Sequence, residues 1–275
     1  MGPDHASRRQ RGNKLLNPDQ DNPRLAYDYG SDSGYETELH LTAALDALVR
    51  GEDSRHPDRR FFQIVHLITE YSWVGVHDAL AGVAADLDAD RPSAAGDALV
   101  RARDLAAITV SCARLLLEQL PQDRFLAMRQ FFPDEASGLD SPGGRNLRKV
   151  GTVVWTSFTQ AVSRNGSTLD ELVQGTSGGN EQTVRLAAAM SGLHRLDARL
   201  LEWKQVHLNL VWSVLGGHPN TGAEASEEER PTSLRGRPTS DLERLAVRPL
   251  FPELWRATTA SFHAQAAAGA GGVES

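Results

Sequence analysis

The sequence predicts an all-α protein that folds as a single-domain helical bundle. Apolar residues recur at helical spacing over long stretches, whereas convincing alternating strands are absent. The chain has 275 residues, of which 40% are hydrophobic, and is therefore long enough to bury a sizeable core. These observations favour one bundle built on four long helices.

The N-terminal part of the chain is expected to consist of a tail and a first helix. Residues 1–30 contain Pro, Asp, Asn and Arg throughout and show no periodicity, so we predict a disordered tail. Ser33 and Gly34 then precede a predicted helix over about 35–49, which ends near Gly51.

The four long helices follow from the helical period and from the turn residues at their ends. They are predicted over about 58–87, 94–120, 145–163 and 181–215, with short helices over 122–132 and 167–173. Pro121 ends one of them, and Asn165 with Gly166 ends another, because neither proline nor a glycine turn readily continues a helix.

The region after the last long helix is predicted to be irregular. Residues 217–239, rich in Gly, Pro, Ser, Thr and Glu, are expected to form a mobile loop, and two short helical pieces follow over 241–260. Residues 262–275 are of low complexity and are expected to be disordered. The folded domain should therefore span residues 31–261.

Composition argues against some classes of partner. The formal net charge of −7 argues against nucleic acids and anionic membranes as main partners. No apolar run reaches the roughly 18 residues that a membrane span needs. The single cysteine, Cys112, excludes an intrachain disulfide, and no secretory signal is recognisable, so a cytoplasmic protein is expected.

One histidine, His207, lies in the apolar stripe of the predicted helix over 181–215. Leu200, Trp203, Leu210, Val211 and Val214 occupy the same face at helical spacing. An imidazole among apolar side chains needs a polar partner, which is either a core carbonyl group or a metal ion. The helix alone does not distinguish the two.

Five segments of the chain, in the same order, resemble motifs of one known family. They read YETELHL (35–41), RFFQIVHLITEYSW (60–73), RFLAMRQFFPDEASGLDSPGGR (124–145), WKQVHLNLVWSVLGGHPNTG (203–222) and LFPELWRATT (250–259). In these segments the chain resembles the tryptophan 2,3-dioxygenase superfamily, the haem-dependent aromatic oxygenases. The resemblance implies a helical bundle of that type, a haem b cofactor with its iron, and an enzyme that acts on a free aromatic L-amino acid.

The resemblance assigns the haem contacts to four residues. His207 matches the proximal ligand of the haem iron, and Trp203, one turn before it, would pack beside that ligand. His66 matches the distal, catalytic histidine, which handles a proton beside the oxidant. Arg145 matches the arginine that pairs with a haem propionate.

The resemblance implies the substrate contacts in the same way. Arg129 matches the arginine that binds the substrate carboxylate, a role for which a guanidinium fork is suited. Thr221 matches the threonine at the amino-acid end of the substrate, and Phe62 and Phe125 match the aromatic walls around its ring.

Three further matches concern the edge of the pocket. Ser137 and Gly138 match a Ser-Gly turn near the open side of the iron. Tyr35 matches a tyrosine that enters the pocket of a neighbouring subunit. The resemblance therefore implies a homo-oligomer, either a dimer or a tetramer.

The chain departs from the family motifs at several ring-facing and loop positions. Leu139 and Asp140 replace Phe and Gln, and Glu38 replaces a tyrosine. NTGAEAS (220–226) keeps only Thr-Gly of a glycine-rich loop, and Lys204 lies in the arginine region before the proximal histidine. Because the haem and amino-acid anchors are kept, the chain looks more like relatives in bacterial secondary metabolism, such as antibiotic biosynthesis, which include haem-dependent tyrosine hydroxylases.

The expected reaction is the 3-hydroxylation of L-tyrosine to 3,4-dihydroxyphenylalanine, with hydrogen peroxide or with dioxygen and a reductant. An alternative within the family is the opening of the indole ring of tryptophan, or of a related substrate, by dioxygen. A third reading, of a different class, is a non-catalytic haem sensor or scaffold. The presence of Arg129 and Thr221 speaks against the third, but the motifs do not decide between the first two.

Overall fold

Helices dominate the computed structural model, which describes residues 14–31, 33–50, 54–133, 136, 138–174, 180–218, 231–232 and 238–271. Within these ranges the strands form one short antiparallel pair, and an isolated bridge joins Thr232 and Pro238. No helix in this part of the chain has the length and apolar character needed to cross a membrane. The prediction of an all-α, single-domain fold is confirmed.

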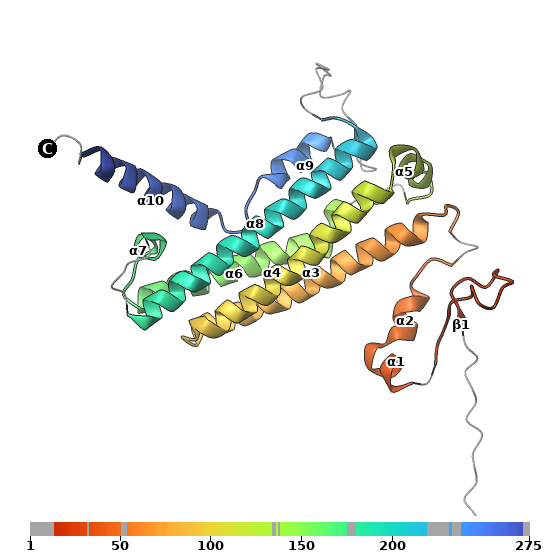
Figure 1. Cartoon of the computed structure of the whole chain (residues 1–275), viewed down its shortest axis with the longest axis horizontal. Helices are drawn as coiled ribbons and strands as arrows, with labels where there is room; N and C mark the ends of the chain where they lie inside the picture. The colour runs from red at the N-terminus through yellow and green to blue at the C-terminus, as the bar shows by residue number, and fades with distance from the viewer. Residues whose placement is uncertain are drawn as a thin grey trace, which may run out of the picture.

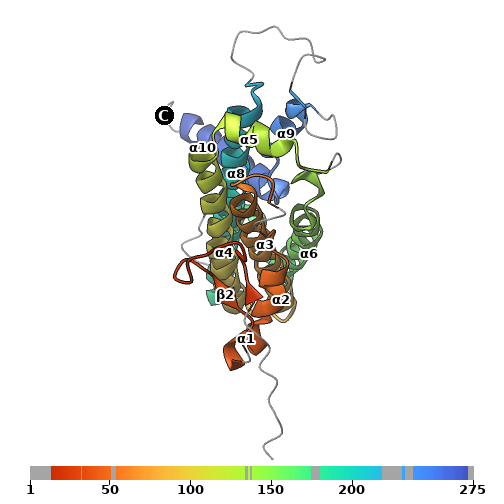
Figure 2. The same ribbon diagram turned by 90° about the vertical axis from the view of Figure 1, so that its right-hand side faces the viewer.

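Four long helices form the body of the protein. They are α3 (Arg59–Asp88), α4 (Pro92–Gln119), α6 (Pro142–Arg164) and α8 (Glu181–Leu215). α3 packs against both α4 and α6, and α4 packs against α8 (Figure 1). Figure 2 shows the same bundle turned so that its right-hand side in Figure 1 faces the viewer. The bounds lie within a few residues of the predicted ones, and those of α8 agree with the prediction.

Local sequence explains where these helices begin and end. Pro92 and Pro142 occupy the first helical positions of α4 and α6, where a backbone N–H would have no partner in the helix. The side chain of Asn180 caps α8 by accepting a hydrogen bond from the Thr183 N–H at 2.8 Å. α8 stops at Gly216, whose φ of 83° is readily adopted only by glycine.

The core lies where the four long helices meet. Its fully buried residues include Val76, Leu80, Val83, Ala102, Phe158, Leu186 and Leu193. A Cβ added to Gly75 of α3 would lie 2.9 Å from the side chain of Leu105 on α4. One added to Gly192 of α8 would lie 2.9 Å from that of Leu99, also on α4. The two glycines therefore allow α4 to approach both neighbours closely.

A short N-terminal arm precedes the bundle. It consists of β1 (Lys14–Leu15) paired antiparallel with β2 (Asp28–Tyr29), followed by α1 (Gly34–Leu39) and α2 (Leu41–Asp46). The helix predicted over about 35–49 is thus divided in two. The division occurs at His40, whose left-handed φ of 50° interrupts the helical conformation.

Long-range contacts organise residues 14–31, most of which we expected to belong to a disordered tail. Asp46 of α2 accepts a hydrogen bond from Tyr29 Oη at 2.8 Å and pairs with Lys14. Leu16, Tyr29 and Leu48 also form a small apolar cluster. This cluster packs against Ile64 and Leu67 of α3. Because these partners come from distant parts of the sequence, local composition did not reveal them. Residues 1–13 lie outside the described ranges.

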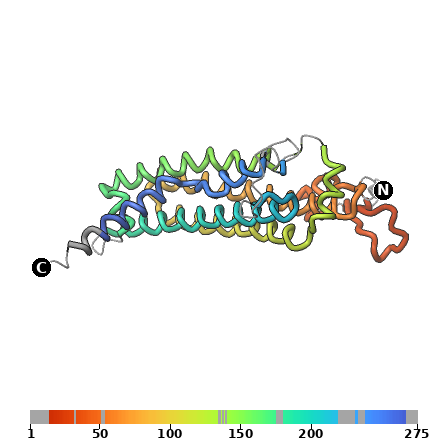
Figure 3. The backbone as a smooth tube through the Cα atoms, turned by 90° about the horizontal axis from the view of Figure 1, so that it is seen from above, coloured from red at the N-terminus to blue at the C-terminus, as the bar shows by residue number. Residues whose placement is uncertain are grey.

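Smaller helices connect and cover the bundle. They are α5 (Gln122–Arg129), the 3₁₀ helix η1 (Gly138–Asp140), α7 (Leu169–Gln174), α9 (Thr239–Ala246) and α10 (Pro252–Gly271). α9 lies along α8, whereas α10 contacts α7 and extends past the end of the bundle (Figure 3). α10 runs to Gly271, so it enters the segment 262–275 that we expected to be disordered. Most of the predicted loop 217–239 lies outside the described residues.

Candidate functional site

His207 lies on α8 beside two tryptophans. Its ring stacks on that of Trp203, with centroids 5.3 Å apart and planes inclined by 19°. The Trp203 ring meets the ring of Trp73 on α3 edge-on at 5.0 Å. His207 is half-buried and makes no hydrogen bond with any residue that the structure describes. Its ring nitrogens therefore remain available to a ligand.

His66 lies on α3, and the preceding helical turn holds its ring. Its Nδ1 atom lies 2.8 Å from the carbonyl oxygen of Phe62, and the centroids of the two rings are 4.0 Å apart. A carbonyl oxygen only accepts hydrogen bonds, so Nδ1 carries a proton and donates it. In the neutral ring the lone pair is then on Nε2, which is free to accept a proton.

His66 lies close enough to His207 to influence its charge. Burial, and then the charge of His66, lower the pKa of His207 to about 4. Burial also lowers the pKa of His66, against the opposing effects of its hydrogen bond to Phe62 and of the Glu70 carboxylate. Both rings are therefore neutral near pH 7, the form in which an imidazole binds a metal or accepts a proton.

The ring of His66 is in contact with solvent, but protein atoms also surround part of it. Its side chain is exposed to solvent, yet the protein around it lowers its pKa by desolvation. The exposure of the side chain and its lowered pKa are both explained by a ring that is open to solvent on one side and covered by protein on the others. The open side leaves the ring within reach of a ligand.

Aromatic and aliphatic side chains pack beside His66. The Phe62 ring contacts that of Phe132 at 5.2 Å. Both phenylalanines and Phe125 of α5 pack against a buried cluster of Val65, Cys112, Leu116, Leu120, Met128, Leu210 and Val214. The structure thus brings together Phe62 and Phe125, the two predicted wall residues. It adds Phe132, which sequence analysis missed although it follows Phe125 by two helical turns.

Glu70, one turn after His66, fastens the start of α6. Its carboxylate accepts hydrogen bonds from Ser141 Oγ at 2.5 Å and from the Gly143 N–H at 3.3 Å. The carboxylate thus acts as an N-terminal cap, where negative charge is favourable. Sequence analysis did not find this role, because Glu70 and Ser141 are 71 residues apart.

Gly143 allows Trp73 to lie against the first turn of α6. A Cβ at this position would overlap Cδ1 of the Trp73 ring. Any larger residue would displace Trp73, whose ring contacts Trp203 beside His207. The packing around His207 therefore depends on glycine at position 143.

Arg129, the predicted carboxylate-binding residue, is the last residue of α5. Its Nη2 atom donates a hydrogen bond to the Thr232 carbonyl oxygen at 2.9 Å. The side chain is half-buried, next to Met128, which is fully buried. A guanidinium has five N–H donors, so this bond leaves others for a carboxylate.

Among the described residues, no hydrogen bond, ion pair or ring contact joins the other predicted residues to either histidine. Arg145, in the first turn of α6, is exposed and makes no hydrogen bond or ion pair with the described residues. Gly138 is exposed in η1. Tyr35 is 69% exposed on α1, so its ring is not packed within its own chain. Ser137 and Thr221 lie outside the described residues.

The residues present fit a haem group that one histidine would hold. Among the described residues, no group of three or more His, Cys, Asp or Glu side chains gathers as a metal site. A haem would require no such group, because the porphyrin carries its own iron and one imidazole side chain would suffice to hold it. His207 meets this requirement, since it is neutral near pH 7 and has no hydrogen bond to the described protein.

The fold and the site define the class of protein as an all-α bundle in which two long helices carry neighbouring neutral histidines. The chain matches no known family model, and no curated protein matches its sequence. The relation to the tryptophan 2,3-dioxygenase superfamily therefore stays a prediction, based on the five sequence segments.

Proposed function

We propose that the protein is a cytoplasmic, b-type haem enzyme that oxygenates the ring of a free aromatic L-amino acid. The preferred reaction is the 3-hydroxylation of L-tyrosine to 3,4-dihydroxyphenylalanine. One observation carries the proposal: His207 is neutral, makes no hydrogen bond with the described protein, and lies within electrostatic reach of His66.

His207 would hold the haem through one ring nitrogen. The stacked ring of Trp203 restricts rotation of the imidazole and so orients that nitrogen. Arg145 has no partner in the described chain, so its charge is available to a propionate. Bound haem would supply the oxidising chemistry: with hydrogen peroxide, one oxygen atom enters a ring C–H bond and the other leaves as water.

His66 would accept the phenol proton of the substrate at Nε2. The hydrogen bond from Nδ1 to Phe62 fixes the tautomer, so Nε2 presents its lone pair without rearrangement. Burial keeps the pKa of His66 below its usual value, so the ring is unprotonated near pH 7 and ready to act as a base.

The remaining roles concern the substrate and the assembly. Phe62 and Phe125 would contact the substrate ring, and the apolar cluster behind them would exclude water from it. Arg129 would bind the carboxylate with the donors that Thr232 leaves unused. Tyr35, exposed on its own chain, would reach the site of another copy in a dimer or tetramer.

Haem binding by the purified full chain is the first test. With haem supplied during expression, the wild-type protein is expected to show a haem absorption band, and His207→Ala is expected to lose it. His194→Ala is the matched control, because His194 is also half-buried on α8 but bonds to Thr258 at 3.0 Å. A colourless wild-type protein would end the proposal.

Product analysis is the second test. The haem-loaded protein is incubated with tyrosine and hydrogen peroxide, and separately with tryptophan and dioxygen under reducing conditions. A catechol product from tyrosine supports the preferred reaction. N-formylkynurenine from tryptophan would instead assign the site to ring opening of an indole.

A non-catalytic haem sensor or scaffold is the second candidate function. The hydrogen bond between Arg129 and the Thr232 carbonyl favours it, because this bond gives Arg129 a structural role without any substrate. Haem binding that depends on His207, with no product from either amino acid, would support this candidate.

A further inference from the structure

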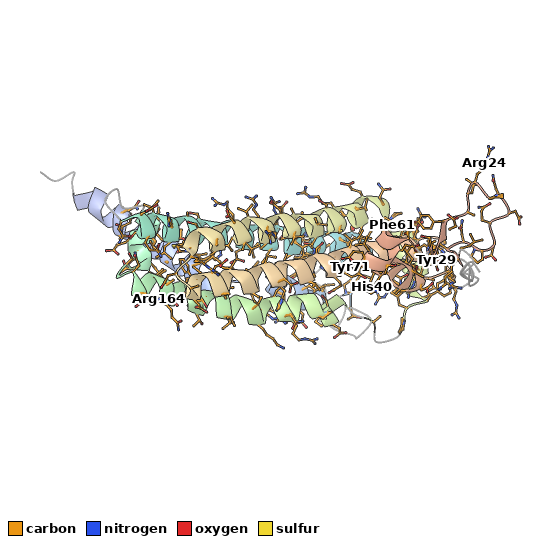
Figure 4. All side chains as sticks on the ribbon, turned by 90° about the horizontal axis from the view of Figure 1, so that it is seen from below. Arg24, Tyr29, His40, Phe61, Tyr71 and Arg164 are labelled. Atoms are coloured by element: carbon orange, nitrogen blue, oxygen red, sulfur yellow. The ribbon has the colours of Figure 1, made fainter. Side chains whose placement is uncertain are left out.

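A cavity rich in arginine lies at the N-terminal end of α3. It has a volume of about 440 Å³ and is lined by Asp46, Leu48, Val49, Arg50, Ser54, Arg55, Arg59 and Phe131. Figure 4 shows this end of the bundle, marked by Tyr29 and Phe61, opposite the end marked by Arg164. None of the described residues assigned to haem or substrate lines the cavity, and neither histidine is among its lining residues.

The described residues that line the cavity carry more positive than negative charge. Among the described residues, Arg50, Arg55 and Arg59 line it together with one carboxylate, that of Asp46. Asp46 already pairs with Lys14, and Arg50 approaches the same carboxylate at 3.8 Å. Arg55 and Arg59 make no ion pair with the described residues. Two guanidinium groups therefore lie beside the cavity without a carboxylate partner.

Arg59 is the most enclosed of the three arginines. Its guanidinium carbon lies 4.4 Å from the centroid of the Phe132 ring, and burial lowers its pKa. Burying a cation is unfavourable unless an opposite charge or a polar group compensates. The cation–π contact with Phe132 offsets part of this cost, and an anion in the cavity would offset more.

We propose that this cavity binds a small organic phosphate monoester, with Arg50, Arg55 and Arg59 around the phosphoryl group. A phosphate monoester carries up to two negative charges, which match the excess positive charge better than one carboxylate does. Leu48 and Val49 also line the cavity and would provide apolar contacts for the organic part.

The phosphate site adjoins the proposed haem site without sharing residues with it. Arg59 contacts Phe132, and Phe132 in turn contacts Phe62, whose ring packs on that of His66. Phosphate binding is measured directly, with or without haem, so this proposal and the proposed function succeed or fail independently.

Calorimetric titration of the full chain tests the ligand class. Phenyl phosphate, inorganic phosphate and benzoate are compared at one fixed ionic strength, so that general charge screening is equal for all three. We expect saturable binding that is tightest for phenyl phosphate, weaker for inorganic phosphate, which lacks the apolar group, and weakest for benzoate. No saturable binding of phenyl phosphate, or equally tight binding of benzoate, would overturn the proposal.

Substitutions test the position of the site. Arg59→Gln is expected to weaken phenyl phosphate binding about tenfold or more, as does the double variant Arg50→Gln/Arg55→Gln. The double variant changes two exposed side chains, so it tests the site even where Arg59→Gln does not fold. Arg185→Gln on α8, whose side chain pairs with Glu181, is the control and is expected to keep wild-type affinity. Unchanged affinity in the double variant would place the anion elsewhere.

Discussion

His66 and His207 are neutral near pH 7, but the protein holds their rings differently. A backbone carbonyl binds one nitrogen of His66 and leaves the other with a defined lone pair. His207 is held by stacking on Trp203 and by burial, and neither of its nitrogens has a partner in the described chain. The first arrangement suits a base with a fixed tautomer, and the second suits a ligand to a metal.

The low pKa of His207 predicts how stability depends on pH. In the unfolded chain its pKa is near 6.5, whereas in the folded chain it is about 4. As pH falls from 6.5 toward 4, the unfolded state binds a proton that the folded state does not, so the free energy of unfolding decreases. The shift corresponds to a loss of at most ~3 kcal/mol of stability at low pH. Above the unfolded-state pKa, His207 causes no loss of stability.

Urea unfolding of the haem-free chain at about pH 7 and about pH 4.5 measures this loss. His207→Gln removes the titrating group, so its free energy of unfolding should fall less than that of the wild type between the two pH values. Because the other titratable groups are the same in both proteins, the difference between the two losses in the free energy of unfolding reports the titration of His207 alone. Parallel losses in the two proteins would contradict the assigned pKa.

Arg129→Gln tests the carboxylate contact of the proposed enzyme. Glutamine keeps a hydrogen-bond donor for Thr232 but removes the charge and the fork, so KM for the amino acid should rise about tenfold or more. The haem absorption band should be unchanged, because Arg129 is not assigned to haem. Arg103→Gln on α4, which pairs with Asp104, should leave KM unchanged. An unaltered KM for Arg129→Gln would show that the substrate carboxylate binds elsewhere.

The start of α6 shows how two adjacent glycines differ in role. Gly143→Ala would force the Trp73 ring aside and should lower the free energy of unfolding by about 1–3 kcal/mol. Gly144→Ala is the matched control, because a Cβ there meets nothing within 4 Å, and it should stabilise the helix by about 0.5 kcal/mol. Urea unfolding of the two variants measures both effects, and equal stabilities would refute the contact with Trp73.

A buried carboxylate joins α8 to the start of α10. Asp197 has no exposed surface and accepts hydrogen bonds from the N–H groups of Leu250 at 2.7 Å and Phe251 at 3.0 Å. It also accepts one from Trp255 Nε1 at 2.9 Å. The three donors satisfy the charge, so the carboxylate fixes the chain that leads into α10.

Asp197→Asn should destabilise the protein, because the amide group offers one oxygen where three donors converge and adds donors of its own. We expect the free energy of unfolding to fall by about 3 kcal/mol. Asp104→Asn, on an exposed surface of α4, should change it by less than about 0.5 kcal/mol. Chemical unfolding followed by circular dichroism compares the two, and a neutral Asp197→Asn would contradict the three hydrogen bonds.

The proposed dimer or tetramer can be tested by measuring the mass of the protein in solution. Tyr35 on α1 is 69% exposed, and the proposed assembly would cover its ring with a second copy of the chain. In sedimentation experiments we expect two or four times the chain mass of 29.9 kDa. Tyr35→Ser should shift the distribution toward the single chain, and a wild-type protein that sediments as one chain would contradict the assembly.

Much of the architecture followed from short-range patterns in the sequence. The helical period, with Pro121, Asn165 and Gly166 as helix ends, predicted the long helices to within a few residues, because these effects act within one or two turns of the chain. The same patterns placed His66 and His207 on helix faces, but they did not show that the two side chains lie near each other.

Contacts between distant segments depend instead on how the helix faces pack. Ser141 meets Glu70, and Phe132 packs against Phe62, only because α3 passes both the start of α6 and the segment that follows α5. The arginine-rich cavity likewise exists only where α2, the start of α3 and the end of α5 converge. Such contacts are set by shape and burial over the whole core, a cooperative property that no local window of residues contains.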